Sequence, residues 1–132
     1  MLQATRRRAV RATAAALCTA ALTLSQANPA AAAEKKVSFA FMYRMDTQAW
    51  KQKMGKVSIL FTWCRNQRSF HATLMRDDWG SDTKLEGHAL TCIKGKRAYF
   101  DAKTDGTYYF TFTKADDGNF VEGNATISYP AA

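Results

Sequence analysis

The chain has 132 residues and a formal net charge of +8 at neutral pH, with three cysteines and two histidines. This length suits one small domain and excludes a large multidomain architecture. The basic composition alone would permit binding to a polyanion, so the location of the basic residues has to be considered.

The first 33 residues have the pattern of a secretory signal peptide. Four arginines lie within residues 6–11, an apolar run rich in alanine and leucine follows over 12–24, and small residues occupy 30–33. The apolar run of about thirteen residues is shorter than the roughly twenty that span a bilayer as a helix. We predict cleavage after Ala33, one secreted domain over residues 34–132 and no stable membrane anchor. The adjacent arginines leave both the general and the twin-arginine export routes open.

Removing this segment changes the charge of the remaining chain. The net charge falls from +8 to +4, because the segment carries four arginines and no acidic residue. This weakens the case for a nucleic-acid partner, and we expect none. The balance is +7 over residues 34–76 and −3 over residues 77–132. Strands interleaved from both halves would give a mixed, solvated surface. The alternative is a basic face that meets an anionic wall polymer or lipid, formed by Lys51, Lys53, Lys56, Arg65 and Arg68.

The cysteines that remain after cleavage are Cys64 and Cys92. An even pair in an exported chain most simply forms one intramolecular disulfide. Two free thiols or an intermolecular bridge are the alternatives. A zinc site would need more ligands, at a recognisable spacing, than these cysteines and the two histidines supply. We therefore expect no metal site and no cofactor.

Alternation with a period of two dominates the rest of the chain, which is typical of strands with one buried face. Asp105-Gly106 and residues 116–119 have the composition of hairpin turns, and residues 77–84 form a longer loop. This spacing predicts an all-β domain, a small antiparallel β-sandwich or barrel of about seven strands. Residues 46–54 are compatible with a helical turn, a loop or an edge strand. The predicted strands cover residues 37–45, 57–64, 70–75, 88–93, 97–101, 108–114 and 120–129.

Sixteen aromatic residues follow the predicted signal peptide, and most occupy alternating strand positions that predict a core, Trp63 among them. Three aromatic residues, Trp50, Trp79 and Tyr109, do not fit this pattern because they lie in polar segments or on the opposite strand face. Exposed aromatic rings beside basic side chains can stack on a ligand or anchor an interface. The candidate ligand-binding surface consists of Trp50, Trp79, Tyr109, Lys51, Lys53 and Arg68.

The sequence gives little support to catalysis. It has no Gly-x-Ser-x-Gly nucleophile motif, and His71 and His88 lie in predicted strands, where a histidine usually faces solvent. The acidic residues of the long loop do not resemble a glycosidase pair, which must flank a sugar from two sides. They also lack the spacing of a calcium loop. We expect no catalytic residues and no enzymatic activity.

Several turn and strand signatures follow one another in a fixed order: Cys64, Leu74-Met75-Arg76-Asp77, Cys92, Gly106-Thr107-Tyr108-Tyr109-Phe110, Lys114-Ala115-Asp116-Asp117-Gly118 and Thr126-Ile127-Ser128-Tyr129. This order resembles a group of small secreted actinobacterial proteins of unassigned function. The resemblance covers roughly Val57 to Tyr129 and implies the fold and export, but no activity.

These observations predict a secreted, monomeric domain that binds an extracellular protein, a polysaccharide or a small ligand. A secreted effector is the alternative, either a protein inhibitor or a basic antimicrobial protein. An inhibitor would present one exposed, rigid loop, for which residues 77–86 are the candidate.

Overall fold

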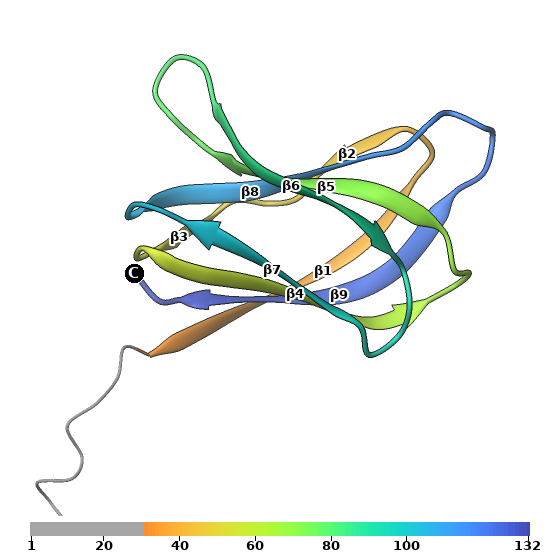
Figure 1. Cartoon of the computed structure of the whole chain (residues 1–132), viewed down its shortest axis with the longest axis horizontal. Coiled ribbons are helices and arrows are strands. Elements are labelled where there is room, and N and C mark those ends of the chain that lie inside the picture. The colour runs from red at the N-terminus through yellow and green to blue at the C-terminus, as the bar shows by residue number, and fades with distance from the viewer. Residues whose placement is uncertain (1–30) are drawn as a thin grey trace, which may run out of the picture.

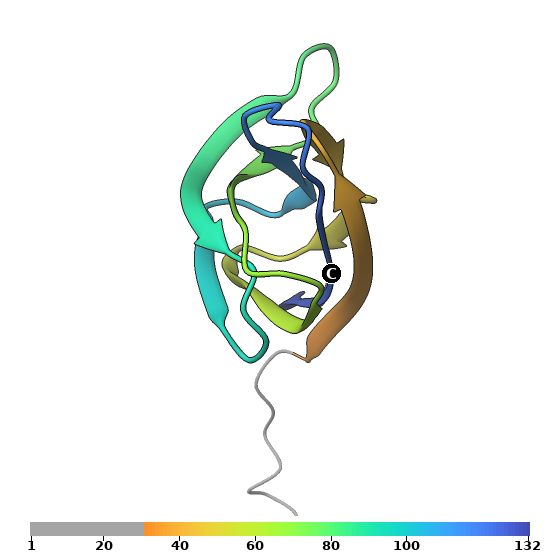
Figure 2. The same cartoon turned by 90° about the vertical axis from the view of Figure 1, so that its right-hand side faces the viewer.

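The structure is a computed structural model that describes residues 31–132. These residues form nine β-strands and no helix, and all paired strands run antiparallel. Two sheets pack face to face (Figures 1 and 2), which confirms the predicted all-β sandwich. The predicted signal peptide lies outside the described residues except for its last three alanines, two of which begin the first strand. The described part of the chain has no helix with the length and hydropathy of a membrane span.

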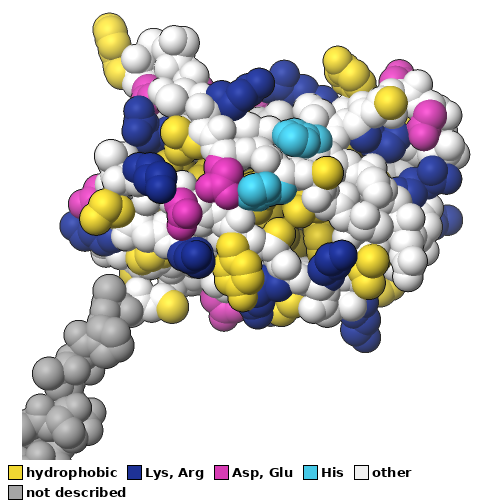
Figure 3. All heavy atoms as spheres, viewed as in Figure 1, with side chains coloured by type: hydrophobic (Ala, Val, Ile, Leu, Met, Phe, Trp, Pro, Cys, Tyr) yellow, Lys and Arg dark blue, Asp and Glu magenta, His cyan; other side chains and the backbone are white. Residues whose placement is uncertain are grey.

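Each sheet combines strands from both halves of the chain. In order, the first sheet contains β1 (Ala32–Phe41), β9 (Val121–Pro130), β4 (Gly55–Cys64) and β7 (Arg97–Ala102). In the second sheet, β2 (Arg44–Asp46) and β3 (Trp50–Gln52) both pair with β8 (Gly106–Thr113), and β5 (Ser69–Arg76) and β6 (Thr83–Thr91) follow. This order places the basic first half of the chain among strands of the acidic second half. Accordingly, basic and acidic side chains are interspersed over the face seen in Figure 3.

Phenylalanine rings fill the space between the sheets. Both sheets contribute to one cluster in which ring centroids lie 5.0 to 6.4 Å apart. All of these pairs are tilted or edge-to-face, and aromatic rings prefer such arrangements to direct face-to-face stacking. Burying each side chain stabilises the fold by roughly 1.5 to 3 kcal/mol relative to exposure. The cluster consists of Phe39, Phe41, Phe61, Phe70 and Phe112.

The predicted first strand is divided in two. Strand β1 ends at Phe41 in the first sheet, and β2 begins at Arg44 in the second sheet. Alternation along one strand over residues 37–45 would place Tyr43 on the same face as Phe39 and Phe41. Because the chain crosses between the layers at this point, Tyr43 is exposed instead. The segment over residues 46–54 contains the short edge strand β3, one of the conformations compatible with its sequence.

A β-bulge reverses the alternation near the end of β4. Phe61 pairs with Ala125, but Trp63 pairs with Asn124, so β4 has one residue more than β9 at this point. The extra residue turns Trp63 outward, where it is 45% exposed, and the predicted core position of Trp63 is therefore wrong. It also turns Cys64 toward the second sheet.

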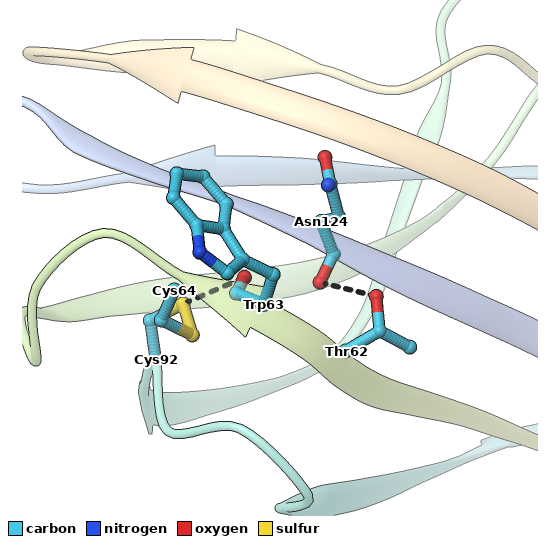
Figure 4. The surroundings of a disulfide bond; sticks show 5 residues. All are labelled: Thr62, Trp63, Cys64, Cys92 and Asn124. Carbon is cyan, nitrogen blue, oxygen red and sulfur yellow. Dashed lines mark hydrogen bonds between the residues drawn. A yellow bond between two sulfur atoms is a disulfide. The ribbon is translucent and has the colours of Figure 1, made fainter.

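The predicted disulfide is confirmed. Cys64 at the end of β4 is bonded to Cys92, which follows β6, with the two Cα atoms 5.7 Å apart (Figure 4). The bond therefore joins the two sheets. Gly123 in β9 leaves room for it, because a Cβ atom at this position would lie 2.5 Å from the Trp63 carbonyl oxygen and 3.0 Å from Cys92 Sγ.

Lys114 organises the loop between β8 and β9. Its side chain is only 6% exposed, and Nζ donates to the carboxylate of Asp117 at 2.7 Å. The same ammonium donates to the carbonyl oxygens of Met42, Ala115 and Asn119 at 3.1, 2.8 and 3.0 Å. Hydrogen bonds from Lys114 and from the Asn119 amide lower the pKa of Asp117 to about 2. We call this arrangement the Lys114 clamp.

The disulfide should contribute a large part of the stability of this small domain. With the cysteines 28 residues apart, the chain-entropy model predicts that Cys64→Ser combined with Cys92→Ser lowers the free energy of unfolding by about 3 to 4 kcal/mol. Urea denaturation measures this loss, and wild-type protein kept in reductant should show the same loss. Equal stability of the oxidised wild type and the double variant would contradict the prediction.

The Lys114 clamp predicts a pH-dependent contribution to stability. Because the pKa of Asp117 falls from 3.8 to about 2 on folding, its ionised form stabilises the fold above pH 3.8, and this contribution is lost as the pH falls through about 2. We expect Asp117→Asn to be less stable than wild type at neutral pH and to approach it near pH 2. Urea midpoints over a pH series measure this, with Asp116→Asn as the control. A difference that does not change with pH would contradict the prediction.

Candidate functional site

The loop between β5 and β6 protrudes from one end of the sandwich (Figure 1). Residues 77–82 form this segment, which we call the Trp79 loop. The Trp79 side chain is fully exposed, with a relative accessibility of 103%. Tryptophan is rarely left wholly in water, because its large apolar surface gains free energy on burial. Trp79 is therefore the most conspicuous candidate for an intermolecular contact.

Arg76 at the end of β5 holds the first part of the Trp79 loop. Its Nε donates to Asp78 Oδ1 at 2.8 Å, and its Nη1 donates to Thr104 Oγ1 at 3.2 Å. Thr83 Oγ1 donates to the other oxygen of Asp78. The hydrogen bonds from Arg76 and Thr83 lower the pKa of Asp78. The amide of Asp77 also donates to the Thr107 carbonyl at 2.8 Å, which joins this end of the loop to β8.

Tyr109 holds the other end of the Trp79 loop. Its side chain lies on the outer face of β8, and its hydroxyl donates to Asp82 Oδ2. This hydrogen bond, together with partial burial and the charge of Asp82, raises the pKa of Tyr109 to about 12. The carboxylates of Asp78 and Asp82 thus bond within the protein. Within residues 31–132, no three His, Cys, Asp or Glu side chains are grouped closely enough to hold a metal ion.

A groove runs along the outer face of the second sheet. Its main hollow has a volume of about 480 Å³ and is lined by basic and hydroxyl side chains, such as Arg44, Lys84 and Thr111, and by the apolar side chains of Met75 and Leu85. An adjoining hollow of about 420 Å³ shares His71 and Thr113 with it. The His71 ring lies across β6 at Gly87, where an added Cβ atom would be 2.7 Å from His71 Nε2. The groove can donate hydrogen bonds to a polar ligand.

His88 helps to close the open edge between the two sheets. Its ring packs on Phe100 at a centroid distance of 4.9 Å, and Nε2 bonds to Glu86. The other oxygen of Glu86 accepts a hydrogen bond from the Asp101 amide of β7 at 3.1 Å. Burial raises the pKa of Glu86, but the hydrogen bonds from His88 and Asp101, with the charges of His88 and Lys103, lower it overall. His88 therefore links β6 to β7.

Trp50 does not belong to an exposed surface, so this part of the prediction is wrong. Its side chain is only 4% exposed and faces the core from the edge strand β3. The indole stacks on Tyr129 at 5.4 Å, and its Nε1 donates to Gln52 Oε1 at 2.7 Å. Trp50 lies among polar residues in the sequence, and the strand has only three residues. The sequence therefore shows no alternating pattern that would indicate a buried face.

Arg68 lies apart from the other predicted surface residues. Lys51 pairs with Thr107 beside Tyr109, near the Trp79 loop. Lys53 forms an ion pair with Asp105 at 3.5 Å. Arg68 precedes β5, whereas the Trp79 loop follows it, so these two features lie at opposite ends of that strand.

The alternative basic face does not form either. Lys51 lies on the outer face of the second sheet and Lys56 on the outer face of the first. Arg65 and Arg68 lie in the turn between β4 and β5. The interleaved strand order therefore separates residues that are close in the sequence.

No protein-family model matches the chain, and no curated protein matches it. Among solved structures, PirA is 9% identical, with 79% of this chain and 97% of that chain covered and a TM-score of 0.44. A structure from Bacillus endospore appendages, described as a family of disulfide-linked pili, is 13% identical, with 80% and 93% covered and a TM-score of 0.42. The Drosophila melanogaster CENP-C cupin domain is 11% identical, with 73% and 59% covered and a TM-score of 0.34. None of these likenesses supports an assignment of function.

The Tyr109 contact gives a spectroscopic test of the loop geometry. The hydrogen bond to Asp82 contributes to a Tyr109 pKa of about 12, compared with the ordinary value of 10.0. In Asp82→Asn we expect this pKa to fall toward 10.0, because the charged acceptor is removed. Titration of the labelled tyrosine ring carbons by NMR measures the shift, with Asp116→Asn as the control. An unchanged Tyr109 titration in Asp82→Asn would contradict the proposed contact.

Proposed function

We propose that this protein is a secreted, non-enzymatic binding protein that places Trp79 in an apolar pocket of an extracellular partner protein. The observation that carries this proposal is the complete exposure of Trp79 on a loop whose two ends are fixed. Tryptophan is among the residues most enriched at the energetic centres of protein interfaces. A loop that is already ordered loses little conformational entropy on binding, which favours affinity.

The shape of the site favours a protein over a polysaccharide. Trp79 lies in a protruding loop, where it can enter a pocket in a partner (Figures 1 and 2). The groove beside it has no phenylalanine, tyrosine or tryptophan in its main hollow, so it offers a sugar chain no aromatic stacking platform. Its basic and hydroxyl side chains suit polar contacts around the tryptophan anchor.

The disulfide supports the extracellular assignment. Structural disulfides form and persist mainly in oxidising compartments, and Cys64 and Cys92 join the two sheets. The signal peptide predicted from the sequence points to the same location. The contacts of His88 support a non-enzymatic role, because Glu86 and Phe100 engage its ring in linking two strands.

A secreted inhibitor is the second candidate, and the braced, protruding loop favours it. Such a loop can occupy the cleft of an enzyme without being distorted on binding. The two candidates differ in the identity of the partner. An inhibitor requires that the partner be an enzyme and that its activity fall when the protein binds.

Photocrosslinking through the loop tests the proposal. Position 79 is replaced by a benzophenone-bearing phenylalanine, and the protein is exposed to the extracellular fraction of the source culture. We expect a defined adduct with one protein, which excess wild type prevents and excess Trp79→Ala does not. The matched control is the same replacement at Trp63, which lies on the outer face of the other sheet.

Two results would contradict the proposal. The first is the absence of an adduct specific to position 79. The second is equal competition by Trp79→Ala and wild type. Retention of the protein on insoluble glycans that Trp79→Ala abolishes would instead indicate a polysaccharide ligand.

A further inference from the structure

A small polar pocket lies at the end of the sandwich away from the Trp79 loop. Its walls are the turn between β4 and β5 and the loop between β8 and β9, and its volume is about 220 Å³. This volume is below the range of about 300 to 1,000 Å³ for drug-sized ligands. We call it the Arg68 pocket, and its lining residues are Arg65, Asn66, Arg68, Asn119, Phe120 and Glu122.

The charges in the Arg68 pocket do not cancel. Arg65 Nη1 lies 3.3 Å from Glu122 Oε1, so the one carboxylate of the pocket is already paired. Arg68 has no ion-pair partner among residues 31–132, and its Nε is buried without a hydrogen-bond partner there. A buried donor without a partner is uncommon in folded proteins and needs an explanation. The pocket thus holds one guanidinium more than carboxylates.

Both walls of the pocket are held in place. Arg65 follows Cys64 directly, its amide donates to the Glu122 carbonyl at 2.9 Å, and the Cys92 amide donates to the Arg68 carbonyl at 3.0 Å. On the other wall, the Lys114 clamp bonds to the Asn119 carbonyl. The Arg68 pocket is therefore ordered before any ligand arrives, which reduces the entropic cost of binding.

We propose that the Arg68 pocket binds a carboxylate group. A guanidinium presents parallel donors that match the two oxygens of a carboxylate. The single excess positive charge balances one carboxylate better than a doubly charged phosphate. The amides of Asn66 and Asn119 can bond the polar groups next to the carboxylate, and the half-exposed ring of Phe120 provides an apolar wall. The ligand is a small organic acid or the terminal residue of a polypeptide.

NMR titration with N-acetylphenylalanine tests this proposal. We expect saturable shifts at the backbone amides of Arg68, Asn119 and Phe120, and none with N-acetylphenylalanine amide, which lacks the carboxylate. Arg68→Lys keeps the charge but loses the paired donors, so affinity should fall about tenfold or more. The matched control is Arg97→Lys on the outer face of the first sheet, which should bind as wild type does. Phe120→Ala should also weaken binding.

Three outcomes would overturn the proposal: equal binding of the amide, undiminished binding by Arg68→Lys, or tighter binding of inorganic phosphate than of N-acetylphenylalanine. A peptide that ends in phenylalanine and binds more tightly than the single residue would identify a polypeptide terminus as the ligand. Equal affinity would identify a free small acid. This experiment does not involve Trp79, so its outcome is independent of the function proposed for the Trp79 loop.

Discussion

The extra residue in β4 determines how one end of the sandwich is built. Without it, Cys64 would point into solvent, because Val57, Ile59 and Phe61 face the core and successive side chains alternate. With it, Cys64 turns inward and reaches Cys92. The bond then fixes the turn that carries Arg68, whose carbonyl accepts from the Cys92 amide. A local change in strand register thus orders a pocket that involves a distant part of the chain.

Charged side chains secure the two long loops of this domain. Lys114 places an ammonium among three carbonyl oxygens and one carboxylate, which orders a loop that contains little apolar surface. In the Trp79 loop the charged groups are Arg76, which donates to Asp78, and the Asp82 carboxylate, which accepts from the neutral Tyr109 hydroxyl. Charged hydrogen bonds of this kind are stronger than neutral ones. Polar contacts of this kind therefore order both loops at the surface of the domain.

The fold was largely predictable from the sequence, whereas the binding surfaces were only partly so. Alternating apolar residues located most strands, and the pairing of Cys64 with Cys92 follows from their being the two cysteines after the predicted signal peptide. Trp63 was misplaced because no sequence pattern marks a bulge. Trp50 was misplaced because a three-residue edge strand is too short to show its alternation. The Arg68 pocket depends on two loops that meet only in the folded sandwich, so sequence spacing could not reveal it.

The disulfide has a further consequence for the Trp79 loop. The covalent ring closed by Cys64 and Cys92 contains β5, the loop and β6. An exposed, protruding loop is a preferred target for proteases. A cut anywhere within residues 77–82 would open that ring without separating the two pieces, because the disulfide still joins them. The domain can therefore be nicked at its most accessible point and remain one covalent molecule until it meets a reductant.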